Sequence, residues 1–483
     1  MANLFVKKPL SQLLAQAADS ESGLKRTLTA VNLVALGIGA IIGAGLFVRT
    51  AAASYEAAGP AVTLSFVVAA VGCAFAGLCY AEFAAMIPIA GSAYTYAYAT
   101  MGELVAWIIG WALIMEYALG AATVSIAWSE YLNKLLSKFG MSIPYEWAHS
   151  PLESLNGVSG IMNAPALVIL LALTLLLIRG TQESATVNGI IVLIKVSIVL
   201  LFIALGWQFI NPANHTPYMI PEGTAGHEGF FKHGVGGIVG GAAIVFFAFI
   251  GFDAVSTAAQ EAKDPAKDMP IGILGSLVVC TILYILFSHV LTGVANWSEF
   301  GAAGKEASVA YAIEKYMTGY SWLATSVTVA ILAGFSSVIL VMLMGQSRVF
   351  YSMANDGLLP KVFSELHPTY RTPYKSNWIL FVFVGLFAAF IPGSVAGDLT
   401  SFGTLLAFVL VSIGVFIMRR TDPDVVRPFR APVIGFVAPM GVIICGGMII
   451  ALDIHTLTAA VLWMLLGLVV YFAYSSKTSK LQK

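Results

Sequence analysis

Long apolar stretches recur along the whole 483-residue chain, and they constrain its fold more than any other feature. A stretch of about 20 apolar residues is long enough to cross the hydrocarbon core of a bilayer as a helix. Because 59% of the residues are hydrophobic and only 10% are charged, the chain is too apolar and too long for one soluble domain. The sequence therefore predicts an all-α integral membrane protein that has no room for a large extramembrane domain.

The apolar stretches predict about twelve transmembrane helices. We place them at 30–51, 61–87, 102–129, 163–178, 185–209, 235–258, 271–296, 320–346, 376–392, 396–418, 432–452 and 455–474. This gives a ten-helix core over 30–418, divided into 30–209 and 235–418, followed by helices 11 and 12 over 432–474. The remaining ends, 1–29 and 475–483, are expected to be tails.

The distribution of Lys and Arg over the connecting segments predicts the orientation. If the N-terminus is cytoplasmic, the cytoplasmic segments carry roughly three times as many basic residues as the outer ones. An odd number of spans would scramble this partition. We therefore expect both termini on the cytoplasmic side of a plasma (inner) membrane.

A glycine run interrupts the first span. The segment GIGAIIGAG places Gly37, Gly39, Gly43 and Gly45 where a membrane helix is expected to be continuous. Each glycine costs a helix interior about 1 kcal/mol relative to alanine, and unwound backbone at bilayer depth is tolerated only where it lines a cavity or is buried in protein. The free N–H and C=O groups of such a break can bind a small zwitterion or an ion. Close helix packing through small residues is the alternative explanation.

A second interruption is expected in the sixth span. Its centre, Phe247 to Asp253, combines the flexible Gly251 with an acidic residue. Broken helices at corresponding positions of two halves are typical of inverted-repeat secondary transporters. The two breaks fall where a five-plus-five arrangement needs them, and spans 11 and 12 would lie outside the repeat.

Three ionisable residues lie deep in predicted spans, where each is expensive to bury. Lys195 is near the middle of the fifth span, and a buried ammonium without a carboxylate partner releases its proton easily, as a proton carrier must. A structural ion pair is the alternative. Glu116 in the third span and Asp253 in the sixth could pair with Lys195 or attract a cationic ligand; Asp253 could instead cap the half-helix after the break.

Other site classes find little support in the sequence. Cys73, Cys79, Cys280 and Cys445 all lie inside predicted spans, so neither a disulfide framework nor metal-ligand spacing is present. No basic cluster interleaved with aromatic residues indicates a nucleic-acid partner. We find no nucleophile–base pair at one depth of the bilayer, so we expect neither an enzyme nor a metal or organic cofactor.

An ordered set of motifs resembles a known family. The motifs are GIGAIIGAGLFV (37–48), YAEFAAMIPIAGSAYTYAYATMGE (80–103), FAFIGFDAVSTAAQEAKDPAKDMPIGI (247–273), GQSRVFYSMANDGLLP (345–360) and RPFRAP (427–432). Together they are similar to bacterial members of the cationic amino acid transporter family, within the amino acid–polyamine–organocation superfamily. The resemblance implies a twelve-span transporter with the inverted-repeat fold, which works by alternating access.

The resemblance also implies roles for particular residues. The substrate carboxylate would bind backbone N–H groups around Gly43, Ala44 and Gly45. Its α-amino group would be received by carbonyls at Ile41 and at three positions of span 6: Phe247, Ala248 and Ile250. Lys195 matches the lysine that proton-coupled relatives place where sodium-coupled relatives bind a cation, so the proton would be the coupling ion.

The side chain of the substrate is less constrained than its backbone. Ser336 and Ser337 in the eighth span could leave room for arginine or lysine, with Glu116 or Asp253 as counter-charge, although helix packing explains these serines equally well. We expect proton-coupled uptake of L-amino acids, including cationic ones. An amino acid–amine exchanger, an importer restricted to small neutral amino acids, and a non-transporting sensor stay as alternatives. The expected partners are the amino acid substrate and the lipid bilayer, and a small single-span membrane subunit is left open.

Overall fold

The computed structural model of the chain describes residues 4–18, 24, 26–43, 45–155, 157–301, 308–450, 452 and 454–482. Helices dominate this part of the chain, and its strands are the two-residue β1 (Ser154–Leu155) and β2 (Val158–Ser159), which pair as an antiparallel hairpin. Eight helical segments are long and apolar enough to cross a membrane, and four shorter apolar helices accompany them. The short helix Ala30–Ile41 and the first part of the long segment Gly45–Met86 form span 1, and the rest of that long segment forms span 2. The described segments therefore form twelve spans, as the sequence predicts.

The spans follow the order of the predicted apolar stretches, with boundaries that differ by a few residues. They are formed by α2 (Ala30–Ile41) with η1 (Gly45–Arg49) and α3 (Thr50–Ala53); α4 (Val62–Met86); α6 (Glu103–Ile114) with η4 (Met115–Leu119) and α7 (Gly120–Ser137); α9 (Ala164–Arg179); α10 (Thr181–Gly206); α11 (Gly234–Phe246) with η8 (Phe247–Phe249) and η9 (Asp253–Glu261); α12 (Pro265–Val294); α14 (Ser321–Asn355); α15 (Tyr374–Phe390); α16 (Gly393–Thr421); α17 (Ile434–Ile450); and α18 (Ile454–Val470).

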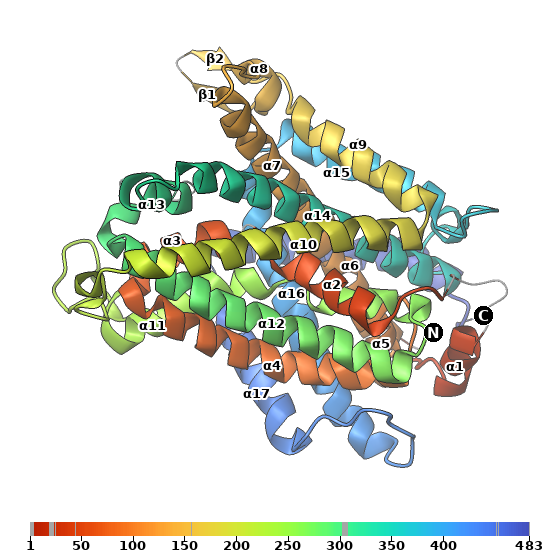
Figure 1. Cartoon of the computed structure of the whole chain (residues 1–483). Coiled ribbons are helices and arrows are strands. Elements are labelled where there is room, and N and C mark those ends of the chain that lie inside the picture. The colour runs from red at the N-terminus through yellow and green to blue at the C-terminus, as the bar shows by residue number, and fades with distance from the viewer. Residues whose placement is uncertain are drawn as a thin grey trace.

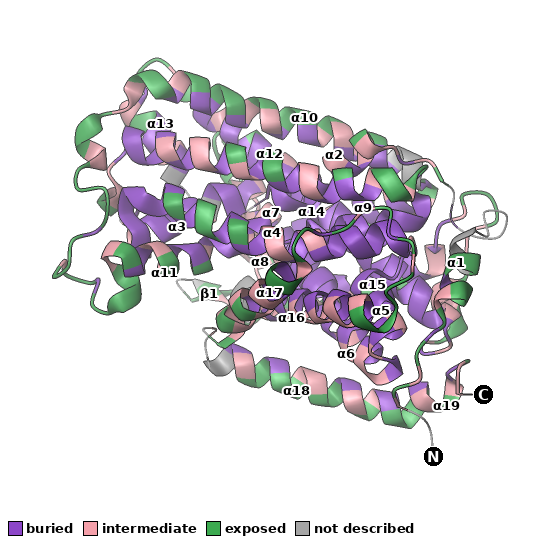
Figure 2. Ribbon diagram, turned by 90° about the horizontal axis from the view of Figure 1, so that it is seen from below, coloured by how far each residue is buried: buried purple, intermediate pink, exposed green. Residues whose placement is uncertain are grey.

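The outer faces of the bundle are apolar, as expected for a protein surrounded by lipid. Large hydrophobic side chains such as Val71, Leu193 and Val278 are about half exposed or more. A soluble monomer rarely exposes contiguous apolar surface on this scale. Figure 2 shows the same pattern, with buried residues concentrated in the middle of the bundle and exposed ones along the outer sides of α10 and α18.

The centre of the bundle is occupied by α14, whose most apolar stretch is 83% buried, compared with 22% for the corresponding stretch of the last span. Its 35 residues extend over about 53 Å at 1.5 Å per residue. It packs against α2, α7, α10 and η9, while α9 and α15 lie together on one side and α17 on the other (Figure 1). The eighth span therefore contacts parts of both the first span (α2) and the sixth span (η9).

The first and sixth spans lie side by side. The helical pieces that follow and precede their two breaks, η1 and η8, are in contact. At one end of the bundle, the chain before α2 pairs with the chain after η9: Leu28 and Ala262 form a parallel bridge, and Leu28 N–H donates to the Glu261 carbonyl at 2.9 Å. The two broken spans thus form one unit inside the bundle.

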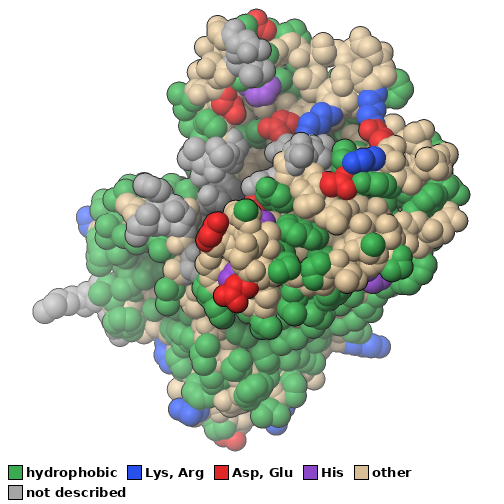
Figure 3. All heavy atoms as spheres, turned by 90° about the vertical axis from the view of Figure 1, so that its left-hand side faces the viewer, with side chains coloured by type: hydrophobic (Ala, Val, Ile, Leu, Met, Phe, Trp, Pro, Cys, Tyr) green, Lys and Arg blue, Asp and Glu red, His purple; other side chains and the backbone are tan. Residues whose placement is uncertain are grey.

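Both termini lie at the same end of the bundle (Figure 1), as an even number of spans requires. Lys8 forms an ion pair with Asp356, which follows the last turn of α14, and Lys480 N–H donates to the Asp356 carbonyl. The opposite end, which Figure 3 faces, carries mostly hydrophobic and uncharged side chains, with acidic and basic groups concentrated in the upper part of that view.

Candidate functional site

Helix 1 is interrupted where the glycine run predicts. The α-helix ends at Ile41, Ile42 has an extended backbone (φ −76°, ψ 96°), and a π-helical turn begins at Gly45. Ala44, one of the predicted substrate-binding positions, lies outside the described residues. The Ile42 N–H still donates to the Ile38 carbonyl, but the carbonyls of Ile41 and Ile42 lie beyond the regular hydrogen-bond pattern of the helix.

Helix 6 is interrupted at the predicted place as well. The α-helix ends at Phe246, and after the short turn of η8 the backbone of Ile250 is extended (φ −59°, ψ 135°). Gly251 has φ +109°, a conformation that strains other residues, so the glycine permits the change of direction here. A 3₁₀ helix then runs from Asp253 to Glu261.

The two breaks touch each other through Gly45. A Cβ atom added to Gly45 would lie 2.3 Å from Cα of Ala248, and one added to Gly43 would lie 2.7 Å from Cγ2 of Val338 in α14. These distances are too short for a real side chain. The structure therefore brings the predicted backbone positions of span 1 and span 6 together, and it also gives the glycines a packing role.

Tyr284 of α12 connects the two breaks, and the sequence analysis did not single it out. Its hydroxyl lies 2.9 Å from the Ile41 carbonyl and 2.8 Å from the Ala248 carbonyl, and its side chain is fully buried. These are two of the carbonyls that the family resemblance assigns to the substrate ammonium. The signal in the sequence is weak: a tyrosine in the middle of an otherwise apolar span, with a polar tip that needs a partner when buried.

Lys195 holds the broken end of helix 1 from the fifth span. Its fully buried ammonium donates to the carbonyls of Gly39 (2.9 Å) and Ile42 (2.7 Å) and to the Ser337 hydroxyl (3.1 Å). Three acceptors match the three N–H bonds of a protonated lysine. No carboxylate of the described residues forms an ion pair with it.

The two predicted serines of α14 have different surroundings. Ser337 accepts from Lys195 and donates to the Gly39 carbonyl at 2.5 Å, so it belongs to the lysine site. Ser336 accepts from the Trp128 indole N–H of α7 at 3.0 Å, which is a contact between helices. Asn188 of α10, which sequence reasoning missed, adds a bond from its amide to the Ala35 carbonyl of α2.

Glu116 and Asp253 interact with each other and form no ion pair with Lys195. Both are fully buried, and each carboxyl group lies within electrostatic reach of the other. The Tyr117 hydroxyl donates to Oδ2 of Asp253 at 2.8 Å, and Thr404 of α16 lies beside Glu116. Both oxygens of Glu116 and Oδ1 of Asp253 have no well-aligned hydrogen-bond partner among the described residues. We call these two side chains the carboxyl pair.

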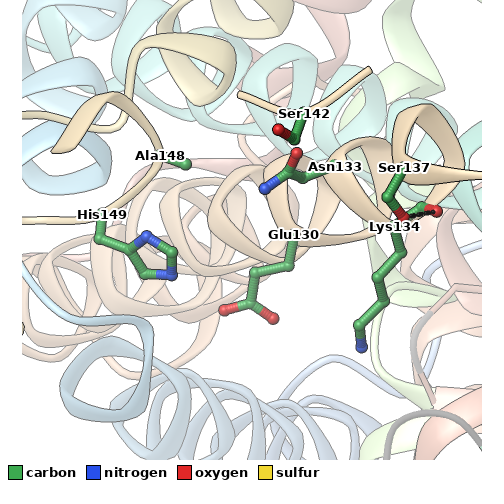
Figure 4. A pocket seen from close by; sticks show the side chains of 7 residues that line it. All are labelled: Glu130, Asn133, Lys134, Ser137, Ser142, Ala148 and His149. Carbon is green, nitrogen blue, oxygen red and sulfur yellow. Dashed lines mark hydrogen bonds between the residues drawn. The ribbon is translucent and has the colours of Figure 1, made fainter. Parts of the chain in front are cut away.

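A separate polar pocket of about 470 Å³ lies at the end of α7 far from the termini. It is lined by Glu130, Asn133, Lys134, Ser137, Ser142, Ala148 and His149. Figure 4 shows the side chains of Glu130, Lys134 and His149 pointing towards one open space. None of these residues was predicted as a site, and the pocket shares no lining residue with the two breaks.

Comparison with known proteins identifies the family of the chain. The amino acid permease family matches residues 28–478. The chain is 43% identical to a branched-chain amino acid permease, BcaP, of Bacillus subtilis, over 100% of this chain and 99% of that protein. It is 39% identical to a methylthioribose transporter of the same species over the full length of both chains, and 34% identical to the vacuolar cationic amino acid transporter 4 of Arabidopsis thaliana, over 88% of this chain and 68% of that protein.

The family match and the full-length relatives agree with the two broken spans that meet in the middle of the bundle. They make this chain a transporter rather than an enzyme. The protein is a multi-pass membrane protein of the amino acid permease family, within the amino acid–polyamine–organocation superfamily, and it transports amino acids.

Proposed function

We propose that the protein is a proton-coupled importer of L-amino acids in the plasma membrane, with both termini in the cytoplasm, and that Lys195 carries the coupling proton. The contact of Lys195 with helix 1 is the observation that carries the proposal. A neutral amine has two N–H bonds and one lone pair, so it cannot donate to all three of its present acceptors. Deprotonation therefore loosens the hold of the fifth span on the break in helix 1 and biases the opening of the site.

The backbone of the two breaks recognises the common part of every amino acid. N–H groups at Gly43 to Gly45 face the substrate carboxylate, and carbonyls at Ile41, Phe247, Ala248 and Ile250 receive its ammonium. The meeting of Gly45 with Ala248 supports a single site that is built from both spans. Backbone recognition leaves the side chain of the substrate open, which fits relatives that are named for branched-chain and for cationic amino acids.

Uptake into proteoliposomes tests the proposal. Labelled leucine and labelled arginine are followed under an inward proton gradient in wild type, Lys195→Met and Lys195→Arg, with the exposed Lys361→Ala as matched control. Gradient-driven accumulation in wild type and in the control, and its loss in both Lys195 variants, is the expected result. Arginine keeps the positive charge but does not release a proton, so Lys195→Arg separates coupling from charge.

Exchange of internal for external amino acid is the second candidate function. Uptake that does not depend on the proton gradient but requires amino acid inside the vesicle would show that the protein is an exchanger and not a proton-coupled importer. Uptake of leucine without any uptake of arginine would keep the mechanism and narrow the substrates to neutral amino acids.

A further inference from the structure

The carboxyl pair is a buried cluster that the coupling lysine does not neutralise. Glu116 comes from the π-helical turn in the middle of span 3, and Asp253 begins the 3₁₀ helix after the break in span 6. Among the described residues, neither carboxyl group forms an ion pair with a lysine or an arginine. The two acidic groups therefore depend on each other and on neutral neighbours.

The neighbours of the pair come from four elements and carry no positive charge. Tyr117 donates to Asp253, Thr404 of α16 lies beside Glu116, and Tyr80 and Cys73 of α4 and Tyr96 of α5 (Ser92–Thr100) lie within electrostatic reach of Asp253. Two ionised carboxylates close together inside a protein repel each other, so such a pair shares a proton. One negative charge then stays uncompensated.

The pair lies close to the place where a substrate would be held. Asp253 follows Ile250 by three residues, directly after the break in span 6. The three oxygens without a well-aligned partner, Oε1 and Oε2 of Glu116 and Oδ1 of Asp253, are acceptors for a positively charged group. For the pair to act on a substrate, the side chain of a bound amino acid has to extend from the two breaks towards Asp253.

We propose, on the basis of the function proposed above, that the carboxyl pair is a subsite for one exchangeable positive charge. A cationic substrate supplies this charge with its own side-chain ammonium or guanidinium. A neutral substrate does not, and a proton from the outer solution then binds to the second carboxylate. The proton leaves with the substrate on the inner side, so a neutral amino acid is transported with one proton more than a cationic one.

Because a proton and a cationic side chain can replace each other at the carboxyl pair, one protein transports both neutral and cationic amino acids. In both cases the occupied pair is neutral, and the total charge moved per cycle is the same, because the extra proton replaces the charge of the side chain. The cost of burying an uncompensated carboxylate is thereby avoided for either substrate.

L-lysine and L-norleucine are a matched pair of probes, because they have the same chain length and differ in the terminal ammonium. Binding of each to the purified full-length protein is measured between pH 5 and 9, where the lysine side chain stays protonated. If norleucine needs one further proton, the ratio of its Kd to that of lysine rises by about tenfold per pH unit over the upper part of this range. In proteoliposomes, a pH-sensitive dye reports one more proton per norleucine than per lysine.

The double variant Glu116→Gln/Asp253→Asn removes both charges with little change of shape. We expect norleucine binding to persist, the pH dependence of the ratio to disappear and lysine to bind more weakly. Glu314→Gln, which removes an exposed carboxylate paired with Lys138, should behave as wild type. If the double variant does not fold, the number of protons transported per norleucine and per lysine in wild type still tests the inference.

Two results would overturn the inference. Equal proton counts for lysine and norleucine would show that no charge is exchanged, and a ratio that keeps its pH dependence in the double variant would place the exchange elsewhere. Both results leave proton-coupled transport through Lys195 intact. Loss of all gradient-driven transport in wild type would instead remove the proposed function, and the inference with it.

Discussion

Two side chains from different spans hold the broken part of helix 1. Lys195 of α10 binds the carbonyls of Gly39 and Ile42, and Tyr284 of α12 joins the carbonyl of Ile41 to that of Ala248. All four acceptors are backbone atoms that an intact helix would satisfy internally. At the scale of the residue, the candidate site therefore consists of main-chain groups that side chains of two other spans hold.

In the proposed function, the carbonyls of Ile41 and Ala248 bind the substrate ammonium in place of the Tyr284 hydroxyl, and this leads to a prediction for Tyr284→Phe. The variant loses a hydroxyl that interacts with two buried carbonyls, which costs about 1–3 kcal/mol per unsatisfied group. We expect a lower Tm without substrate and a larger increase in Tm on adding leucine than in wild type, because the substrate ammonium replaces the lost donor. Thermal unfolding in detergent measures both values. Equal stabilisation by leucine in the two proteins would contradict this account of the carbonyls.

Gly45→Ala tests the contact between the two breaks. The new Cβ would lie 2.3 Å from Cα of Ala248, a backbone atom that cannot move without shifting span 6. We expect loss of amino acid uptake to a tenth of wild type or less, about 1.4 kcal/mol in free energy or more. Gly446→Ala is the matched control, because nothing lies within 4 Å of a Cβ added at that position in α17. Unchanged uptake in Gly45→Ala would show that the breaks need no close approach.

At the scale of the element, a short helix outside the spans packs against the part of span 1 that follows the break. The helix α13 (Ser308–Tyr316) contacts η1 and is fastened by Glu299 of η10 (Trp297–Phe300). Glu299 accepts from Tyr311 at 2.8 Å, from Lys315 at 2.7 Å and from Tyr316 at 2.5 Å. Glu299 thus connects three side chains of α13 to the turn that precedes it.

This carboxylate makes the attachment of α13 depend on pH. Partial burial raises the pKa of Glu299, but the hydrogen bonds from Lys315, Tyr316 and Tyr311 outweigh burial, so the pKa lies below its usual value. A lowered pKa in the folded state stabilises the contact above the ordinary Glu value of about 4.3, and the stabilisation is lost as pH falls through the lowered pKa.

We expect faster amide hydrogen exchange over 308–316 in Glu299→Gln at pH 7, and in wild type at pH 3.5 after correction for the intrinsic rate. Glu365→Gln, which removes an exposed carboxylate that is paired with Lys375 outside α13, serves as control. Unchanged protection of 308–316 in Glu299→Gln would mean that the helix is held by its apolar face alone.

At the scale of the whole molecule, the ends of the chain are bound to the same end of the bundle. Lys8 pairs with Asp356, and Glu103 accepts from Ser479 (2.5 Å) and Gln482 (2.6 Å). The described residues of both terminal segments are therefore attached to the bundle through these contacts. Their shared location follows from an even number of spans, whereas the side of the membrane is a prediction from the basic residues.

Labelling of intact cells tests this orientation. The four native cysteines are buried, so single cysteines introduced at exposed positions can be labelled against a low background. A thiol reagent that does not cross membranes should modify Ser137→Cys, at the end of α7 far from the termini, and leave Lys361→Cys unmodified until the cells are opened. The reverse pattern would place the termini outside.

The membrane fold follows from local properties of the sequence. A stretch of about 20 apolar residues in a bilayer must satisfy its backbone within the segment, so each one becomes a helix irrespective of its neighbours. Glycine weakens a helix wherever it stands. The spans, the breaks at Gly43 and Gly251 and the depth of Lys195 could therefore be predicted from the chain alone.

The partners of the buried groups could not be predicted from the sequence, because they depend on which faces of distant helices meet. Only the tertiary structure brings Tyr284 to the carbonyls of both breaks and pairs Glu116 with Asp253 rather than with Lys195. It also assigns Ser337 to the lysine and Ser336 to Trp128, although the two serines are neighbours in the sequence. Adjacent residues of a helix point in directions about 100° apart, and the packing of the other helices decides what each of them meets.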